Sequence, residues 1–187
     1  MNGIGKNDIY RLTKSPVLYV AIVFAFLLPF TLTMILRQNI NFGVGVSTFG
    51  EPMIVTFREM QDIILMGVRY HMGLGVFTAI LLSVFIGQEY QWSTWQHKWI
   101  IGKSRAGIYL SKLIVSCATS IALFLLFQAV ALLSSGRMSE IASREYAALI
   151  LNGVFVYVAL GAVICMLSML IRNHIASIIA SLVFGVF

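Results

Sequence analysis

Of the 187 residues, 59% are hydrophobic and 11% are charged, and the 13 Lys and Arg against 7 Asp and Glu give a formal net charge of +6. A soluble domain carries roughly 25% charged and 45–50% apolar residues, so this composition, with a mean hydropathy of +0.92, excludes a soluble globular protein and indicates lipid as the solvent. Disorder, collagen, a coiled coil and a disulfide scaffold are excluded on the same grounds.

The chain begins with a segment that predicts an interfacial elbow helix over residues 1–15. Basic side chains at Lys6, Arg11 and Lys14 alternate with apolar ones, as in a helix that lies on a membrane surface. Pro16 then turns the chain into the first apolar run. That run is longer than the apolar core of a signal peptide and is followed by no small-residue cleavage motif, so we expect it to remain in the mature protein.

Five uncharged runs predict the membrane spans. They cover residues 16–36, 70–88, 113–136, 146–171 and 173–187. The first four match the ~20 residues that a helix needs to cross the hydrocarbon core, and the fifth is about a turn short. The predicted fold class is an all-α membrane protein, a polytopic helical bundle of four full transmembrane helices plus a partial fifth in a single domain over residues 1–187. The fifth run is either a half-span or part of a chain truncated from something longer.

The distribution of charge predicts the orientation. Net positive charge falls in the N-terminal segment, in residues 89–112 and at Arg172, whereas residues 37–69 and 137–145 are balanced. Lys and Arg mark cytoplasmic segments, so we expect a multi-pass protein of the cell (plasma) membrane with a cytoplasmic N-terminus. The basic balance is thus topological, and no nucleic-acid partner is expected.

Small side chains recur every fourth residue in the second run. This ridge consists of Gly75, Ala79, Ser83 and Gly87. The last run repeats the pattern at Ser177, Ser181 and Gly185. Because no hydrophobic force drives helices together in lipid, such ridges allow close backbone approach. They predict packing within a bundle or across a dimer, although small residues are also common in spans without that role.

The four full runs contain no ionisable Asp, Glu, Lys or Arg. This lack removes the usual signature of an ion pathway, so a secondary transporter fits poorly. Pro29 and Asn152 are better explained as structural residues than as the lining of a cavity. Cys117 and Cys165 lie far apart in apolar runs and are expected to be buried fillers.

No catalytic residue and no metal site is expected. His71, His97 and His174 have no HExxH motif and no Cys or carboxylate at metal spacing, and no serine lies in a GxSxG motif. The residues 102–104 match the tail of a phosphate-binding loop, but His97 stands at the position of its first glycine and no strand precedes it. The chain is therefore not expected to hydrolyse ATP by itself.

Residues 89–112 form the most polar segment, which the charge distribution places in the cytoplasm. One side of a helix here would carry the interface anchors Trp92, Trp95 and Trp99, since tryptophan prefers the headgroup level. The opposite side would carry Glu89, Gln96, His97 and Lys103, with a helix stop at Gly102. One interpretation is an interfacial helix that only anchors the bundle. The other is a cytoplasmic coupling helix that offers its polar side to a partner.

At this segment the sequence resembles the permease subunits of ABC-type exporters of the second kind, particularly the small Gram-positive ones of lantibiotic immunity and bacitracin export. The residues that carry the resemblance are Glu89, Tyr90, Ser93, Thr94, Gly102, Ser104, Arg105 and Ile108–Lys112. Ser93 replaces the glycine that this family favours. The order of parts also matches, but family members look like six-span proteins, so the resemblance implies an incomplete fifth span and no sixth.

The resemblance implies an export function in antibiotic resistance. A permease of this kind pairs with a second copy or a sister permease and with ATP-binding subunits that hold ATP and Mg²⁺, and it moves an amphipathic peptide, antibiotic or lipid-like substrate. The residues expected to dock the ATPase are Glu89, Tyr90, Thr94, Gln96, His97, Lys103 and Arg105. Membrane lipids are the remaining expected partner.

Residues 37–69 predict an outer segment with a Gly-rich stretch and then an amphipathic helix. The apolar side of that helix would carry Ile54, Phe57, Met60 and Ile64 on the outer membrane surface. It would be either a substrate gate or a passive lid. Two other functions share the composition: a membrane-embedded enzyme, which needs a carboxylate cluster or a His pair that is not found, and a non-transporting scaffold or sensor subunit.

Overall fold

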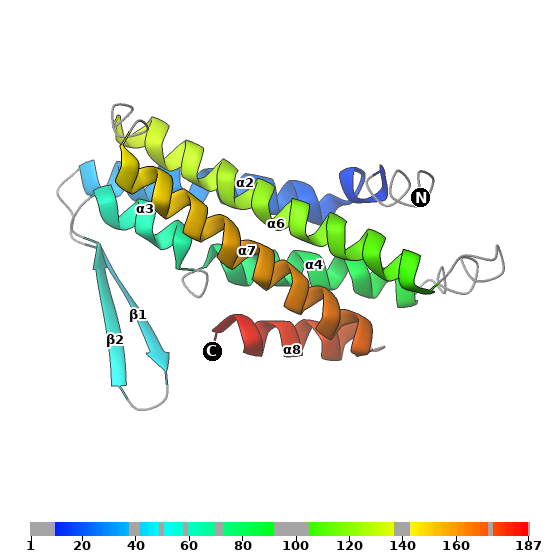
Figure 1. The fold of residues 1–187 in the computed structure, drawn as a ribbon. Coiled ribbons are helices and arrows are strands. Elements are labelled where there is room, and N and C mark those ends of the chain that lie inside the picture. The colour runs from blue at the N-terminus through cyan, green and yellow to red at the C-terminus, as the bar shows by residue number, and fades with distance from the viewer. Residues whose placement is uncertain are drawn as a thin grey trace.

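The computed structural model describes residues 10–37, 42–48, 51–57, 60–69, 73–91, 105–136, 143–171 and 174–186. Its elements are α2 (Pro16–Arg37), β1 (Phe42–Thr48), β2 (Glu51–Phe57), α3 (Met60–Val68), α4 (Leu74–Gln91), α6 (Arg105–Ser135), α7 (Arg144–Leu170) and α8 (His174–Val186). One further helical turn, residues 10–13, precedes α2. The helices lie side by side in one elongated bundle, and the two strands project from one end of it (Figure 1).

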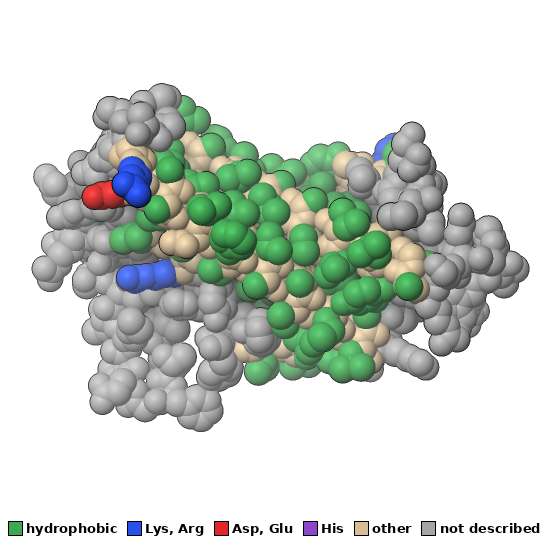
Figure 2. All heavy atoms as spheres, in the orientation of Figure 1, with side chains coloured by type: hydrophobic (Ala, Val, Ile, Leu, Met, Phe, Trp, Pro, Cys, Tyr) green, Lys and Arg blue, Asp and Glu red, His purple; other side chains and the backbone are tan. Residues whose placement is uncertain are grey.

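Three helices within the described residues are long and apolar enough to cross a membrane. They cover Pro16–Ile35, Ala106–Ser135 and Arg144–Leu170. The visible face of the bundle is almost wholly hydrophobic, with the charged side chains near its two ends (Figure 2). The predicted helical membrane protein is thereby confirmed, with spans close to the expected runs in α2, α6 and α7. The structure does not confirm the full count of four spans and a partial fifth, because the apolar helix Leu74–Gln88 and α8 are both shorter.

The outer segment differs most from the sequence prediction. Instead of one amphipathic helix starting near Ile54, the chain forms an antiparallel hairpin and then α3. Val44 pairs with Val55 and Val46 with Met53, an alternation of apolar side chains that favours strands. The sequence analysis did not predict these two strands, whereas the other described elements are helical.

The helix α3 lies inside the bundle rather than on an outer surface. Ile63 is 1% and Ile64 3% exposed, packed against Leu32 of α2 and Ala131 and Leu132 of α6. Its polar neighbours in sequence had suggested a surface helix, but its apolar residues bury against three other helices. The prediction of a helix on the outer membrane surface is wrong for these residues.

Together α3 and α4 form one discontinuous helical segment. Gly73 begins α4 with φ +123°, a left-handed conformation that favours glycine, and its carbonyl accepts from the Phe77 amide at 3.0 Å. The helix within the predicted span over residues 70–88 thus starts at Leu74, and the preceding helix α3 packs into the same bundle. Helices that start or end within a membrane protein are tolerated where other groups satisfy the freed backbone.

Side chains from the neighbouring helices satisfy the end of α3. Gln128 Nε2 of α6 donates to the Ile64 carbonyl at 2.9 Å, and the Tyr157 hydroxyl of α7 donates to the Gly67 carbonyl at 3.0 Å. The last carbonyls of a helix lack partners within that helix. The two long spans therefore hold α3 at its C-terminal end.

The packing of α6 on α7 forms the centre of the core. Phe124 is fully buried, lies against Gly153 and stacks on Tyr157 with ring centroids 4.8 Å apart. Gly161 lets Ser120 approach in the same way. Glycine at these positions of α7 is required by close approach of the helices, since a methyl group would overlap its neighbour.

The chain runs back and forth so that its connections alternate between the two ends (Figure 1). The start of α2, the end of α4, the start of α6 and the end of α7 lie at one end, opposite the hairpin. The described helix ends that border the segments with net positive charge thus lie at a single end of the bundle. This agrees with the alternation inferred from charge, while the assignment of that end to the cytoplasm remains a proposal.

Candidate functional site

The expected docking segment joins α4 to α6 at the end of the bundle where the chain starts (Figure 1). Glu89 and Tyr90 belong to the last turn of α4, and Arg105 is the first residue of α6. The other expected docking residues and the anchors lie outside the described residues: Thr94, Gln96, His97, Lys103, Trp92, Trp95 and Trp99. The structure therefore fixes the two helices that flank the segment.

Residues 105–112, which were assigned to the loop, form the first two turns of α6. The third span is consequently longer than the predicted run over 113–136. Because α6 is one continuous helix from Arg105 to Ser135, a displacement of its start would move the whole span.

Lys112 is the residue in this region that sequence reasoning missed. It was assigned to a cytoplasmic loop, yet its side chain is 0% exposed, and its Nζ lies 4.6 Å from the centroid of the Phe85 ring in α4. At that distance an ammonium group is attracted to the negative face of the ring. The signal was available in the spacing, because Lys112 stands three, four and seven residues before the buried Val115, Ser116 and Thr119.

Phe85 belongs to a cluster of apolar side chains from neighbouring elements. We call them the root cluster; it consists of Leu12, Phe85, Ile86, Val115 and Cys165, with Leu18, Leu113 and Met169 packed against it. The cluster joins the turn before α2 to α4, α6 and α7. The helices α4 and α6, which border residues 92–104 in sequence, thus contact each other through this cluster.

The ridge of small residues in α4 is buried. Ala79 and Ser83 are 0% exposed, and Gly75 and Gly87 are buried as well. The Ser83 hydroxyl donates to the Ser181 Oγ of α8 at 2.6 Å, and the Ser168 hydroxyl of α7 donates to Ser83 at 3.4 Å. Ser177 and Ser181 of α8 are fully buried. In this structure the ridge of α4 is therefore covered by α8 of the same chain.

An apolar groove of about 440 Å³ opens between α6 and α7 toward the opposite end of the bundle. It is lined by Leu125, Gln128, Ala129, Leu132, Leu133, Tyr146 and Ile150. Gln128 and Tyr146 are its polar side chains, and the buried Gln128 Oε1 accepts no hydrogen bond from the described residues. A buried acceptor without a donor is unfavourable.

The described residues contain no candidate metal centre. These parts of the chain hold no group of three or more His, Cys, Asp or Glu that could bind a metal. Both cysteines are free, Cys165 buried and Cys117 half-buried, with the Cys117 thiol 3.6 Å from the Val158 carbonyl. The described part of the chain is a bundle of helices with an apolar groove between α6 and α7 and the root cluster near one end.

A comparison with protein families finds one whose model matches residues 6–187, and its description is ABC-2 family transporter protein. The match covers almost the whole chain, including the segment between α4 and α6. No curated protein and no solved structure matches the chain.

Proposed function

Because the chain belongs to the ABC-2 transporter family, and is therefore the membrane-spanning permease component that associates with an ATP-binding subunit, we propose that it exports an amphipathic substrate. The substrate class is a peptide, an antibiotic or a lipid-like molecule, as in the lantibiotic and bacitracin exporters that the sequence resembles. ATP and Mg²⁺ act in the partner subunit, and this chain catalyses no reaction of its own. Two permease chains, identical or sister, complete the transporter in the plasma membrane.

The observation that carries the proposal is the fastening of α4 to α6 beside the expected docking segment. The Lys112 Nζ of α6 lies 4.6 Å from the centroid of the Phe85 ring of α4, and Phe85 belongs to the root cluster. An ATP-binding subunit that grips residues 92–104 from the cytoplasm would move both helices together rather than bend one of them. Nucleotide then biases the bundle between two states through its different contacts in each.

The groove between α6 and α7 supports an amphipathic substrate. Its lining is apolar apart from Gln128 and Tyr146, a composition that suits a hydrocarbon body with a few polar groups. Its distance along α6 from the docking segment agrees with coupling through the helix, since α6 runs from Arg105 to the groove without a break.

The first experiment asks whether the chain binds an ATP-binding cassette protein through the proposed segment. The chain is purified with the cassette protein encoded beside it, and Glu89→Ala combined with Thr94→Ala should abolish the association. Glu145→Ala is the matched control, because Glu145 is an exposed carboxylate in the first turn of α7 at the other end of the bundle. Equal loss with both variants, or no association with a cassette protein, would refute the docking role.

The second experiment separates coupling from binding. Charge reversal at Lys103 and Arg105 should leave ATP hydrolysis by the assembly measurable while resistance to the exported compound falls. Retention of both activities at the wild-type level would exclude these residues from the docking surface. A membrane scaffold that transports nothing would show no substrate-dependent change in ATP hydrolysis in any of the variants.

A further inference from the structure

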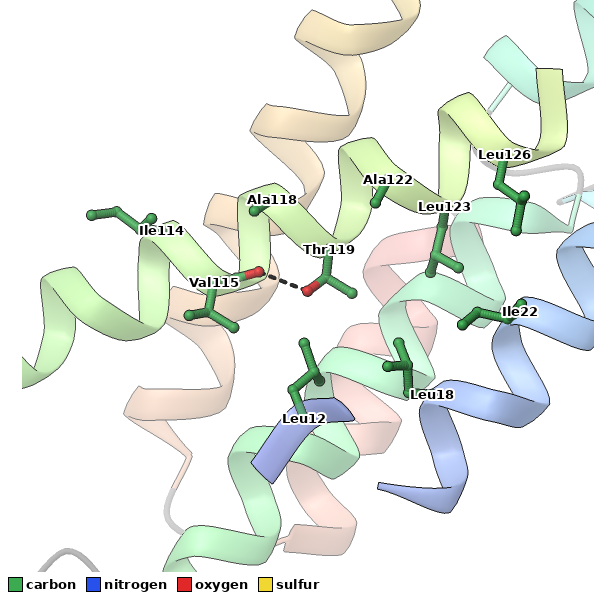
Figure 3. Close-up of a pocket in the computed structure, with 10 residues that line it drawn as sticks. All are labelled: Leu12, Leu18, Ile22, Ile114, Val115, Ala118, Thr119, Ala122, Leu123 and Leu126. Atoms are coloured by element: carbon green, nitrogen blue, oxygen red, sulfur yellow. Dashed lines mark hydrogen bonds between the residues drawn. The ribbon is translucent and has the colours of Figure 1, made fainter. Parts of the chain in front are cut away.

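A second groove lies between α6 and the start of α2, at the end of the bundle that carries the root cluster. It has a volume of about 560 Å³ and is lined by Leu12, Leu18, Ile22, Ile114, Val115, Ala118, Thr119, Ala122, Leu123 and Leu126. Leu12, from the turn before α2, and Leu18 and Ile22, from α2, point toward the lining face of α6 (Figure 3). The walls belong to two membrane-spanning helices, so the groove opens toward the bilayer.

The lining offers no polar group to an occupant. Its one hydroxyl, Thr119, donates to the Val115 carbonyl of its own helix at 2.7 Å (Figure 3), and every other lining side chain is a hydrocarbon. The groove between α6 and α7 differs, because it contains an amide and a phenol. A hydrocarbon chain is the occupant that this lining selects.

The dimensions distinguish an acyl chain from a helix. From Ile114 to Leu126 the groove follows α6 for twelve residue steps, about 18 Å at ~1.5 Å per residue, close to the ~15 Å of one leaflet of a ~30 Å hydrocarbon core. The groove therefore matches one extended acyl chain in length, and its 560 Å³ is far below the roughly 1,400 Å³ that a fully enclosed helix ~10 Å across and as long would fill.

Basic residues next to the lining residue Leu12 in sequence indicate the headgroup. Leu12 lies in the groove between Arg11 and Lys14 in sequence, and Lys14 is exposed. Both basic residues belong to the segment that leads into the membrane, where positive charge attracts anionic lipids. We propose that this groove is a binding site for one anionic phospholipid, with an acyl chain along Ile114–Leu126 and the phosphate near Lys14.

This site has a consequence for the root cluster. Leu12 and Val115 belong both to the groove and to the cluster, so the bound acyl chain packs against the residues that fasten the turn before α2 to α6. The lipid acts as part of the contact between these two elements, whichever substrate the transporter carries.

The test uses the full chain reconstituted in bilayers with phosphatidylglycerol that bears a photoreactive diazirine on one acyl chain. Mass spectrometry of the crosslinked peptides should place most label on residues 114–126 and on the peptide with Leu12. Ala118→Phe combined with Ala122→Phe fills the groove, and label there should fall several-fold. Both alanines are exposed, so the larger side chains enter the groove and leave the core intact.

Ala159→Phe is the matched control, since Ala159 is exposed on α7 outside the groove; it should leave the label unchanged. Competition with unlabelled lipids should favour phosphatidylglycerol over phosphatidylcholine about fivefold, which corresponds to ~1 kcal/mol for one basic residue near the surface, and Lys14→Glu should remove that preference. Label spread evenly over all lipid-facing helices, or retained in the filled variant, overturns the site. Equal competition by the two lipids overturns its anionic selectivity, and crosslinks to a second copy through these residues overturn the choice of occupant.

Discussion

The substitution Gly153→Ala tests how closely α7 must approach α6. A methyl group at Gly153 would overlap the Phe124 ring, 2.7 Å from its Cε1 and 2.8 Å from its Cε2, whereas carbon atoms pack at 3.5–4.0 Å. The overlap is greatest at the Phe124 Cζ. Phe124 is 0% exposed and stacks on Tyr157, so the ring cannot withdraw by the required distance of more than ~1 Å without displacing a second ring. Tyr157 in turn donates to the Gly67 carbonyl, and the disturbance should reach α3.

The size of the effect follows from two opposing contributions. Overpacking of a close-packed core costs about 1–3 kcal/mol, and replacing glycine by alanine inside a helix recovers up to ~1 kcal/mol. Because the ring is fully enclosed, the strain lies in the upper part of that range and the net loss is about 1–2 kcal/mol. At 2–4 °C per kcal/mol for a chain of this length, the unfolding midpoint should fall by roughly 2–8 °C.

Thermal unfolding of the purified protein in detergent, followed by the loss of the monodisperse peak, measures this shift. Ala159→Leu, on the exposed side of the same helix, should change the free energy of unfolding by no more than ~0.5 kcal/mol. In a Phe124→Leu background the same Gly153→Ala change should no longer destabilise, since the overlapping ring atoms are gone. An unchanged or higher midpoint for Gly153→Ala alone, or a loss that persists without the Phe124 ring, would refute the reasoning.

Two further changes test the contacts around α3 and α8. Tyr157→Phe and Gln128→Met each remove a donor to a carbonyl of α3, and at ~1 kcal/mol per hydrogen bond the amide exchange of residues 63–69 should accelerate about fivefold. The control Tyr19→Phe, on the exposed face of α2, should leave this exchange unchanged. Unaltered exchange in the double variant would show that these two hydrogen bonds do not stabilise α3. Ser83→Leu should lower the unfolding midpoint far more than Ser83→Ala. The larger side chain pushes α8 away, whereas loss of the hydroxyl contacts costs only ~0.6 kcal/mol. Equal losses for both variants would show that α8 does not cover the ridge.

The spans of α2, α6 and α7 could be predicted because the membrane imposes a length and a composition on each. An uncharged run of ~20 residues has few alternatives in a protein of this hydropathy. The alternation of connections between two ends was also accessible, since charge follows topology. These predictions required only local information.

The break between α3 and α4 could not be predicted from the same information. Asp62 and the charged residues before it suggested an outer surface helix, but Ile63 and Ile64 find partners on α2 and α6 that are distant in sequence. The carbonyl groups at the break are satisfied by Gln128 and Tyr157, which no local pattern reveals. The hairpin was missed for a different reason: glycines hid an alternation of valines whose register is visible only when both strands are paired.

Lys112 offers the sharpest test of how motion would pass from the docking segment into the bundle. Its buried ammonium faces the Phe85 ring at 4.6 Å, an attraction of up to ~2 kcal/mol when desolvated, while burial of the charge opposes that gain. Lys112→Met keeps the length of the side chain, so the free energy of unfolding should change by about 1 kcal/mol or less. Lys112→Glu places an anion against the negative face of the ring and should destabilise the protein. On the proposed function, Lys112→Met should nevertheless lower the substrate exported per ATP hydrolysed, because the contact between the ammonium group and the Phe85 ring no longer couples α6 to α4. Arg144→Met, which removes an exposed basic residue at the start of α7, should retain the wild-type ratio. A wild-type ratio in Lys112→Met as well would mean that Lys112 only contributes to packing.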